Sequence, residues 1–192
     1  MNVIVYIFSF LCNQNPFRSF MIADHLMPLC QRCTGLYTGM GLSLLWFLVS
    51  CNYNKGLPPR EIIYVNIICL LLMPVFGFHF LDPGPAWRLW SGLIYGNAIV
   101  SLFLPAAFII YNKNRRITSH KNSSTFSFWI FFAFLNSIPL WFPIQSVWFY
   151  YAEFILILLG LMCIVIGILI VIVFLMKRFV KYAIVKGFCY GH

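Results

Sequence analysis

The chain has 192 residues, of which 62% are hydrophobic and only 9% are charged, whereas a soluble domain carries roughly 25% charged residues. Four acidic residues cannot give a folded chain of this size a polar surface, so the composition excludes a water-soluble globular protein and predicts an integral membrane protein. The net charge of +9 does not indicate nucleic-acid binding, because the basic residues lie between long apolar runs, where they set topology and contact lipid headgroups.

The apolar runs predict an all-α fold, a polytopic transmembrane helix bundle of about five spans. We expect these spans at residues 36–50, 62–79, 89–111, 126–142 and 154–176, since a span needs roughly 20 apolar residues. The run at 1–11 has neither the basic start nor the small-residue cleavage site of a signal peptide. It is expected to form a short helix that lies in the membrane interface or enters it partway.

The same pattern divides the chain into five parts. An N-terminal interfacial segment with a Cys-rich loop is expected at 1–33, followed by a three-span core at 34–111. A polar cytoplasmic loop at 112–124 and two C-terminal spans at 125–176 come next, and a basic cytoplasmic tail at 177–192 ends the chain.

Lysine and arginine are divided unevenly between the two sides of this bundle. One side holds Lys55, Arg60, Lys113, Arg115, Arg116, Lys121, Lys177, Arg178, Lys181 and Lys186, and the other holds Arg18, Arg32 and Arg88. Cytoplasmic loops carry the excess of positive charge. The protein is therefore expected in the cell membrane, with its C-terminus in the cytoplasm and its Cys-rich loop outside.

Small residues recur at helical spacing on two of the predicted spans. Gly35 and Gly39 lie four residues apart on the first, and Gly92 and Gly96 lie four apart on the third. Such spacing lets helix backbones approach closely in lipid, so these glycines predict tight helix contacts. The similarity of TGLYTG at 34–39 to SGLIYG at 91–96 is the pattern of a parallel internal repeat, which two six-residue matches are too short to establish.

Three cysteines and a histidine near the first span carry the main chemical signal. Two residues separate Cys30 from Cys33, and Cys12 and His25 can complete a tetrahedral Cys3His shell of the zinc type. The Cys30–Cys33 pair also suits thiol–disulfide chemistry, because a helix N-terminus and Arg32 both favour a thiolate. A permanent disulfide without metal, or a passive zinc clip, is the third interpretation, and the residues leave all three open.

Ionisable side chains also gather at the outer end of the second span. His79, Asp82 and Arg88 flank a turn made by Pro and Gly at 83–85. Ionisable groups at the end of a membrane span indicate a functional site, with His79 as an alternative metal ligand. A pair of Asp82 with Arg88 that only orders the turn is the simpler alternative. Glu153 is expected to stabilise the N-terminal end of the fifth span.

The stretch CNQNPFRSFMIADHLMPLCQRCTGLYTG at 12–39 resembles the signature of a family of small prokaryotic membrane proteins, domain of unknown function 2085. The matching residues are Cys12, Gln14, Arg18, Ser19, Phe20, Cys30, Arg32, Cys33, Thr34 and Gly35, and more loosely Pro74, Asp82, Arg88, Gly92 and Gly96. The resemblance covers roughly residues 8–111 and implies a polytopic membrane protein with a Cys-rich outer loop, but no activity. The family's His after the first Cys is Asn13 here, so His25 or His79 would have to replace it as a ligand.

These observations favour an uncharacterised integral membrane protein that binds a zinc-type ion in a Cys/His cluster, for a structural or a transport-related purpose. A membrane thiol–disulfide redox protein is one alternative. A non-catalytic scaffold is another, which would bind a different membrane protein or a second copy through its glycine-lined helices. The lipid bilayer is the expected partner in every case, and no reaction is assigned.

Overall fold

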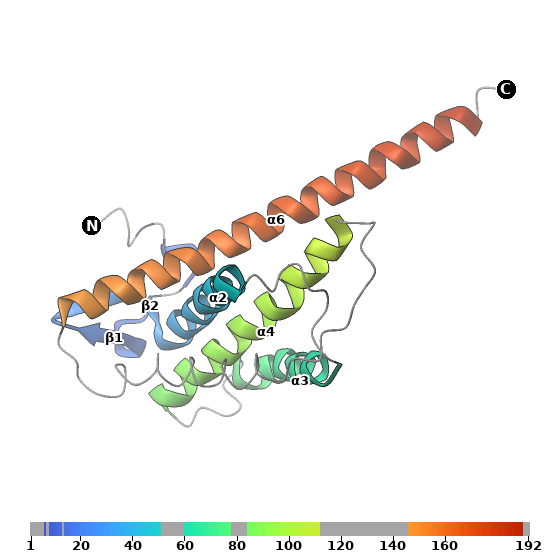
Figure 1. Cartoon of the computed structure of the whole chain (residues 1–192). Coiled ribbons are helices and arrows are strands. Elements are labelled where there is room, and N and C mark those ends of the chain that lie inside the picture. The colour runs from blue at the N-terminus through green and yellow to red at the C-terminus, as the bar shows by residue number, and fades with distance from the viewer. Residues whose placement is uncertain are drawn as a thin grey trace.

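A computed structural model describes residues 6, 8–12, 14–50, 60–77, 84–111 and 146–189 of the protein. Its main elements are four helices, α2 (Gln31–Ser50), α3 (Arg60–Gly77), α4 (Pro85–Tyr111) and α6 (Val147–Cys189). A short 3-10 helix, η1 (Pro16–Arg18), and two strands, β1 (Ser19–Ile22) and β2 (His25–Cys30), come before them. The strands lie at one end of the bundle beside the start of α6, and the other end of α6 projects past the remaining helices (Figure 1).

The prediction of an all-α fold is wrong for the segment before α2. β1 and β2 form an antiparallel hairpin in which Ile22 pairs with His25. The two turn residues, Ala23 and Asp24, both have positive φ angles, 49° and 60°, as the tight turns of two-residue hairpins require. A helix is disfavoured here because Pro28 lacks the N–H that a helix interior needs.

Two of the described helices are long and apolar enough to cross a membrane, over Pro85–Ala107 in α4 and Val147–Met176 in α6. The prediction of about five spans is therefore not supported by the part of the chain that the structure describes. The expected spans at 36–50 and 62–79 overlap α2 and α3, but α2 begins with the polar Gln31 and Arg32, and α3 begins with charged residues. The span expected at 126–142 and the loop at 112–124 lie outside the described residues.

α6 is longer at both ends than the expected span at 154–176. It begins at Val147 and continues to Cys189, a length of 43 residues. At 1.5 Å per residue this helix is about 65 Å long, roughly twice the hydrocarbon thickness of a bilayer. The segment predicted as a basic tail therefore begins as a helical continuation of α6.

Four glycines bring α2 and α4 into backbone contact, as their spacing predicts. A Cβ atom added to Gly39 would lie 2.5 Å from the carbonyl oxygen of Leu93, and one added to Gly35 would meet the carbonyl oxygen of Leu89. In the other direction, a Cβ atom on Gly92 would meet the carbonyl of Arg32 on α2. Only residues without a side chain allow this approach, so the glycines set the distance between the two helices.

This contact is reciprocal. Gly35 faces Leu89, which stands three residues before Gly92, and Gly92 faces Arg32, which stands three residues before Gly35. The next turn repeats the arrangement, because Gly39 faces Leu93 and Gly96 faces Leu36. The contacts advance together along both helices, so α2 and α4 run parallel. The arrangement agrees with the similarity of the two six-residue stretches in sequence.

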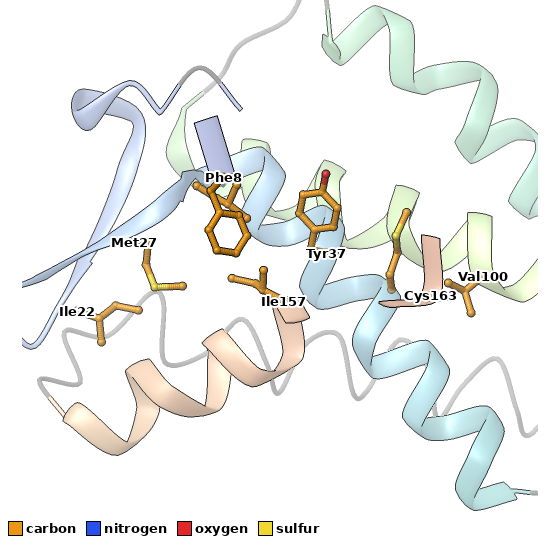
Figure 2. Close-up of a cluster of buried hydrophobic side chains, with 9 residues drawn as sticks. Phe8, Ile22, Met27, Tyr37, Val100, Ile157 and Cys163 are labelled. Carbon is orange, nitrogen blue, oxygen red and sulfur yellow. The ribbon is translucent and has the colours of Figure 1, made fainter. Parts of the chain in front are cut away.

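The apolar core joins the hairpin to the helices. Ile22 and Met27 from the strands meet Phe8 and Ile157, and Val100 with Cys163 extends the cluster along the bundle (Figure 2). Phe8 is only 3% exposed, and its ring makes an edge contact with Phe154 of α6 at a centroid distance of 6.0 Å. The segment predicted to be an interfacial helix is therefore helical where it is described, at residue 6 and at 8–9, and Phe8 anchors it to the core.

Replacing Gly39 with Ala should destabilise the bundle, because the new methyl group would collide with the backbone of Leu93. We expect the free energy of unfolding to fall by about 1–3 kcal/mol, measured by reversible denaturation of the purified protein in detergent. Gly167→Ala is the matched control, since its Cβ would meet the movable ring of Phe103 at 3.0 Å instead of a backbone atom. Equal losses for the two variants would contradict the backbone-contact explanation.

Candidate metal centre

Three thiols from separate parts of the chain converge at the hairpin end of the bundle. Cys12 follows the N-terminal helical segment, Cys30 is the last residue of β2, and Cys33 lies in the first turn of α2. Their sulfur atoms all lie within 4.8 Å of one another, and each residue is half-buried. Since Zn–S bonds are about 2.3 Å long, the three sulfurs could share one ion, as the sequence spacing predicts.

The local structure explains why each thiol points to the cluster. The N–H groups of Leu11 and Cys12 both donate to the carbonyl of Phe8, at 3.0 Å, so the buried phenylalanine fixes the position of Cys12. The β1–β2 pairing places Cys30 opposite Ser19, and the chain enters α2 directly after it. One strand end and one helix start therefore hold the two cysteines of the C-x-x-C pair.

The backbone also supports charge on the first sulfur. The N–H of Cys30 donates to Sγ of Cys12 at 3.4 Å. Hydrogen bonds from the Cys30 and Cys33 thiols lower the pKa of the Cys12 thiol far below its usual value, against the opposing effect of burial. The hydrogen bonds of Cys33 with Cys12 and Cys30, and then burial, raise the pKa of the Cys33 thiol. The cluster therefore stabilises one thiolate before any ion is considered, and metal ligation needs thiolates.

An apolar core and a polar side-chain contact both lie beside the cluster. Cys12 and Cys33 pack against the buried core that contains Phe8 and Leu29. Next to them Gln31 is buried, and its side-chain oxygen accepts a hydrogen bond from Nη1 of Arg88 at 3.3 Å. This contact joins the start of α2 to the start of α4 and fixes the C-x-x-C turn.

His25 does not belong to the group of converging ligand atoms. It is exposed, and its ring lies against Tyr150 of α6 at a centroid distance of 5.4 Å. It pairs with Ile22 at the hairpin turn, at the opposite end of β2 from Cys30.

The other predicted site residues are not among the converging ligand atoms of the thiol cluster, or lie outside the described residues. Gln14, Arg18 and Arg32 are half-buried, and Arg18 ends η1. Arg88 contacts Gln31, as described above, rather than serving the predicted turn alone. His79 and Asp82 lie outside the described residues.

The sequence interpretation missed a buried polar contact between α2 and α6. The hydroxyl of Thr38 donates to Oε2 of Glu153 at 3.0 Å, and both side chains are at most 1% exposed. Glu153 was expected only to stabilise a helix end, but it lies in the second turn of α6 and faces the neighbouring helix. A carboxylate in an otherwise apolar span indicates such a partner, so its presence was a usable signal.

Comparison with known proteins gives a family but no activity. Over residues 12–102 the chain matches the family described as "Predicted membrane protein (DUF2085)". An uncharacterized protein of Methanocaldococcus jannaschii is 34% identical over 112 residues, which are 56% of this chain and 70% of that protein. An uncharacterized protein of Methanothermobacter thermautotrophicus is 33% identical over 70 residues, 36% of this chain and 57% of the relative. No solved structure matches the chain.

Replacing Glu153 with Ala should destabilise the protein, because the buried hydroxyl of Thr38 would lose its acceptor. The expected loss is about 1–3 kcal/mol in the free energy of unfolding, measured by the same denaturation assay in detergent. Glu153→Gln keeps an oxygen acceptor on a side chain of the same length, so its free energy of unfolding should fall by less. If the Gln variant were as unstable as the Ala variant, the hydrogen bond to Thr38 would not explain the burial of Glu153.

Proposed function

The chain belongs to the DUF2085 family of predicted membrane proteins, and we propose that it binds a thiophilic metal ion, zinc being the expected one, through Cys12, Cys30 and Cys33. The observation that carries this proposal is the convergence of three sulfur atoms within 4.8 Å from three separate segments. Soft sulfur ligands of this kind usually bind zinc, monovalent copper or iron–sulfur clusters.

The third sulfur favours a metal over a simple redox pair. A disulfide between Cys30 and Cys33 would need only the C-x-x-C pair, whereas Cys12 lies beside both and accepts the N–H of Cys30. Hydrogen bonding to a thiolate is the type of support that metal ligands receive from their surroundings. His25 is left out of the proposed shell, because its ring lies on Tyr150.

A structural purpose follows from what the three residues connect. An ion shared by them would link the segment before the hairpin to the end of β2 and the start of α2. Binding of an ion that only the folded site can hold stabilises the fold. The glycines proposed for contact with another membrane protein are used between α2 and α4, so the scaffold alternative gains no support from them.

We further propose a multi-pass protein with the thiol cluster on the outer face of the cell membrane. α4 ends at Tyr111 and α6 begins at Val147, at opposite ends of the bundle (Figure 1). These two apolar helices therefore run in the same direction, which suits a chain that crosses the bilayer repeatedly. The sequence pattern, which is expected to leave three arginines on the hairpin side and ten basic residues on the other, supports this orientation.

Element analysis of the purified protein tests the metal site. We expect about one zinc per chain in the wild type, and a large loss of zinc in Cys12→Ser, Cys30→Ser and Cys33→Ser. Cys69→Ser, on α3 and outside the cluster, is the matched control and should keep its zinc, as should His25→Ala. Protein that is prepared without oxygen and carries no metal would contradict the proposal, and a mass-tagging assay would then show whether a disulfide has taken its place.

Labelling of intact cells tests the orientation. Phe17 lies in η1 near the thiols and is 93% exposed, so a cysteine placed there should react with a maleimide that cannot cross membranes. A cysteine in place of Lys113, on the side proposed to be cytoplasmic, should react only after the cells are permeabilised. The reverse pattern would place the thiol cluster inside the cell.

A further inference from the structure

The thiol cluster offers three sulfur donors. Among the residues that the structure describes, the only group of three or more metal-ligating side chains is Cys12, Cys30 and Cys33. Structural zinc sites almost always have four ligands in a tetrahedron. An ion or compound that is satisfied by three sulfurs would use the described site as it stands.

Trivalent arsenic needs only three sulfur ligands. It forms three bonds, and a lone pair fills the fourth direction, so three thiolates complete its shell. The product with three cysteines is electrically neutral, whereas three thiolates leave a net charge of −1 around a divalent ion and −2 around a monovalent ion. Neutrality matters here, because Cys12 and Cys33 pack against the apolar core and buried net charge is costly.

We propose that the cluster binds trivalent arsenic, supplied as its neutral hydroxide, through all three thiols; this inference rests on the proposed function of the same site. Three As–O bonds break and three As–S bonds form. Each hydroxide leaves as water with one proton. The Cys30 and Cys33 thiols supply two of these protons, and the solvent supplies the third, because Cys12 is held as a thiolate. One As(OH)3, two thiols, one thiolate and one proton therefore give one As(SR)3 group and three waters. Arsenic stays trivalent throughout, and no oxidant or reductant takes part.

The arrangement of the site suits this exchange. The ligand arrives uncharged, and the three cysteines are half-buried, so part of each residue is accessible from outside the core. The core that contains Phe8 and Leu29 closes the other side. A neutral, three-coordinate product leaves no unfilled position that a water or a fourth side chain must occupy.

The experiment uses the full-length, reduced protein in detergent with sodium arsenite as the probe. Native mass spectrometry should show one adduct per chain, with the mass of one arsenic atom minus three hydrogens. Cys12→Ser should bind at least about tenfold more weakly, and its adduct should retain one hydroxide on arsenic. Cys69→Ser is again the control and should behave as the wild type. X-ray absorption of the adduct should show three As–S bonds and no As–O bond.

The outcomes separate this inference from the proposed zinc site. Zinc in the wild type without a three-thiol arsenic adduct would overturn the inference and leave the metal site standing. A three-thiol adduct without zinc would support the inference and reject zinc as the resident ion. An adduct of equal mass and affinity in Cys12→Ser would overturn the inference, because the third thiol would then have no part in binding.

Discussion

The close approach of α2 to α4 is the constraint on which the rest of the described structure depends. Without a side chain at Gly35 and Gly92, the two backbones touch near the level where α2 begins. The side-chain contact of Arg88 with Gln31 adds a polar link at the same end. Together they hold the residues between Cys30 and Cys33 in a fixed turn, so the geometry of the thiols derives from helix packing in lipid rather than from the hairpin alone.

The hairpin supplies the second part of the arrangement. It is too small to be stable by itself, and Ile22 and Met27 bury it against the core shared with α6. The same core receives Phe8, which brings the preceding segment close enough for Cys12 to reach the other two thiols. Three segments that are weakly held separately therefore become one unit, and a shared ion would join them at the point where they meet.

Local spacing was enough to predict the parts of the site that obey short-range rules. The C-x-x-C spacing places two sulfurs on one turn. The four-residue glycine spacing places a face without side chains on each of two helices. Neither result depends on the rest of the fold. The inclusion of Cys12 was also correct in position, although its distance in sequence from Cys30 gave no geometric reason for it.

The sequence predictions were wrong or incomplete where the position of a side chain depends on tertiary structure. β1 is only four residues long, and its turn at Ala23 and Asp24 lacks the Asn-Gly or Gly signal of tight hairpins, so the strand pair was not foreseen. Without the strand, nothing indicated that His25 and Cys30 lie at opposite ends of an extended segment. The contact of Thr38 with Glu153 joins residues 115 positions apart, and only the packing of α6 on α2 brings them together.

The reciprocal glycine contact has a consequence for how the two helices differ. Exchanging α2 and α4 leaves the contact unchanged, as in a homodimer of identical helices that has been fused into one chain. In such a pair each surface outside the contact can specialise independently. Cys33 stands two residues before Gly35, and the equivalent position before Gly92 is Trp90. One helix thus carries a thiol of the cluster, while its counterpart carries an aromatic ring at the matching position of the symmetric contact.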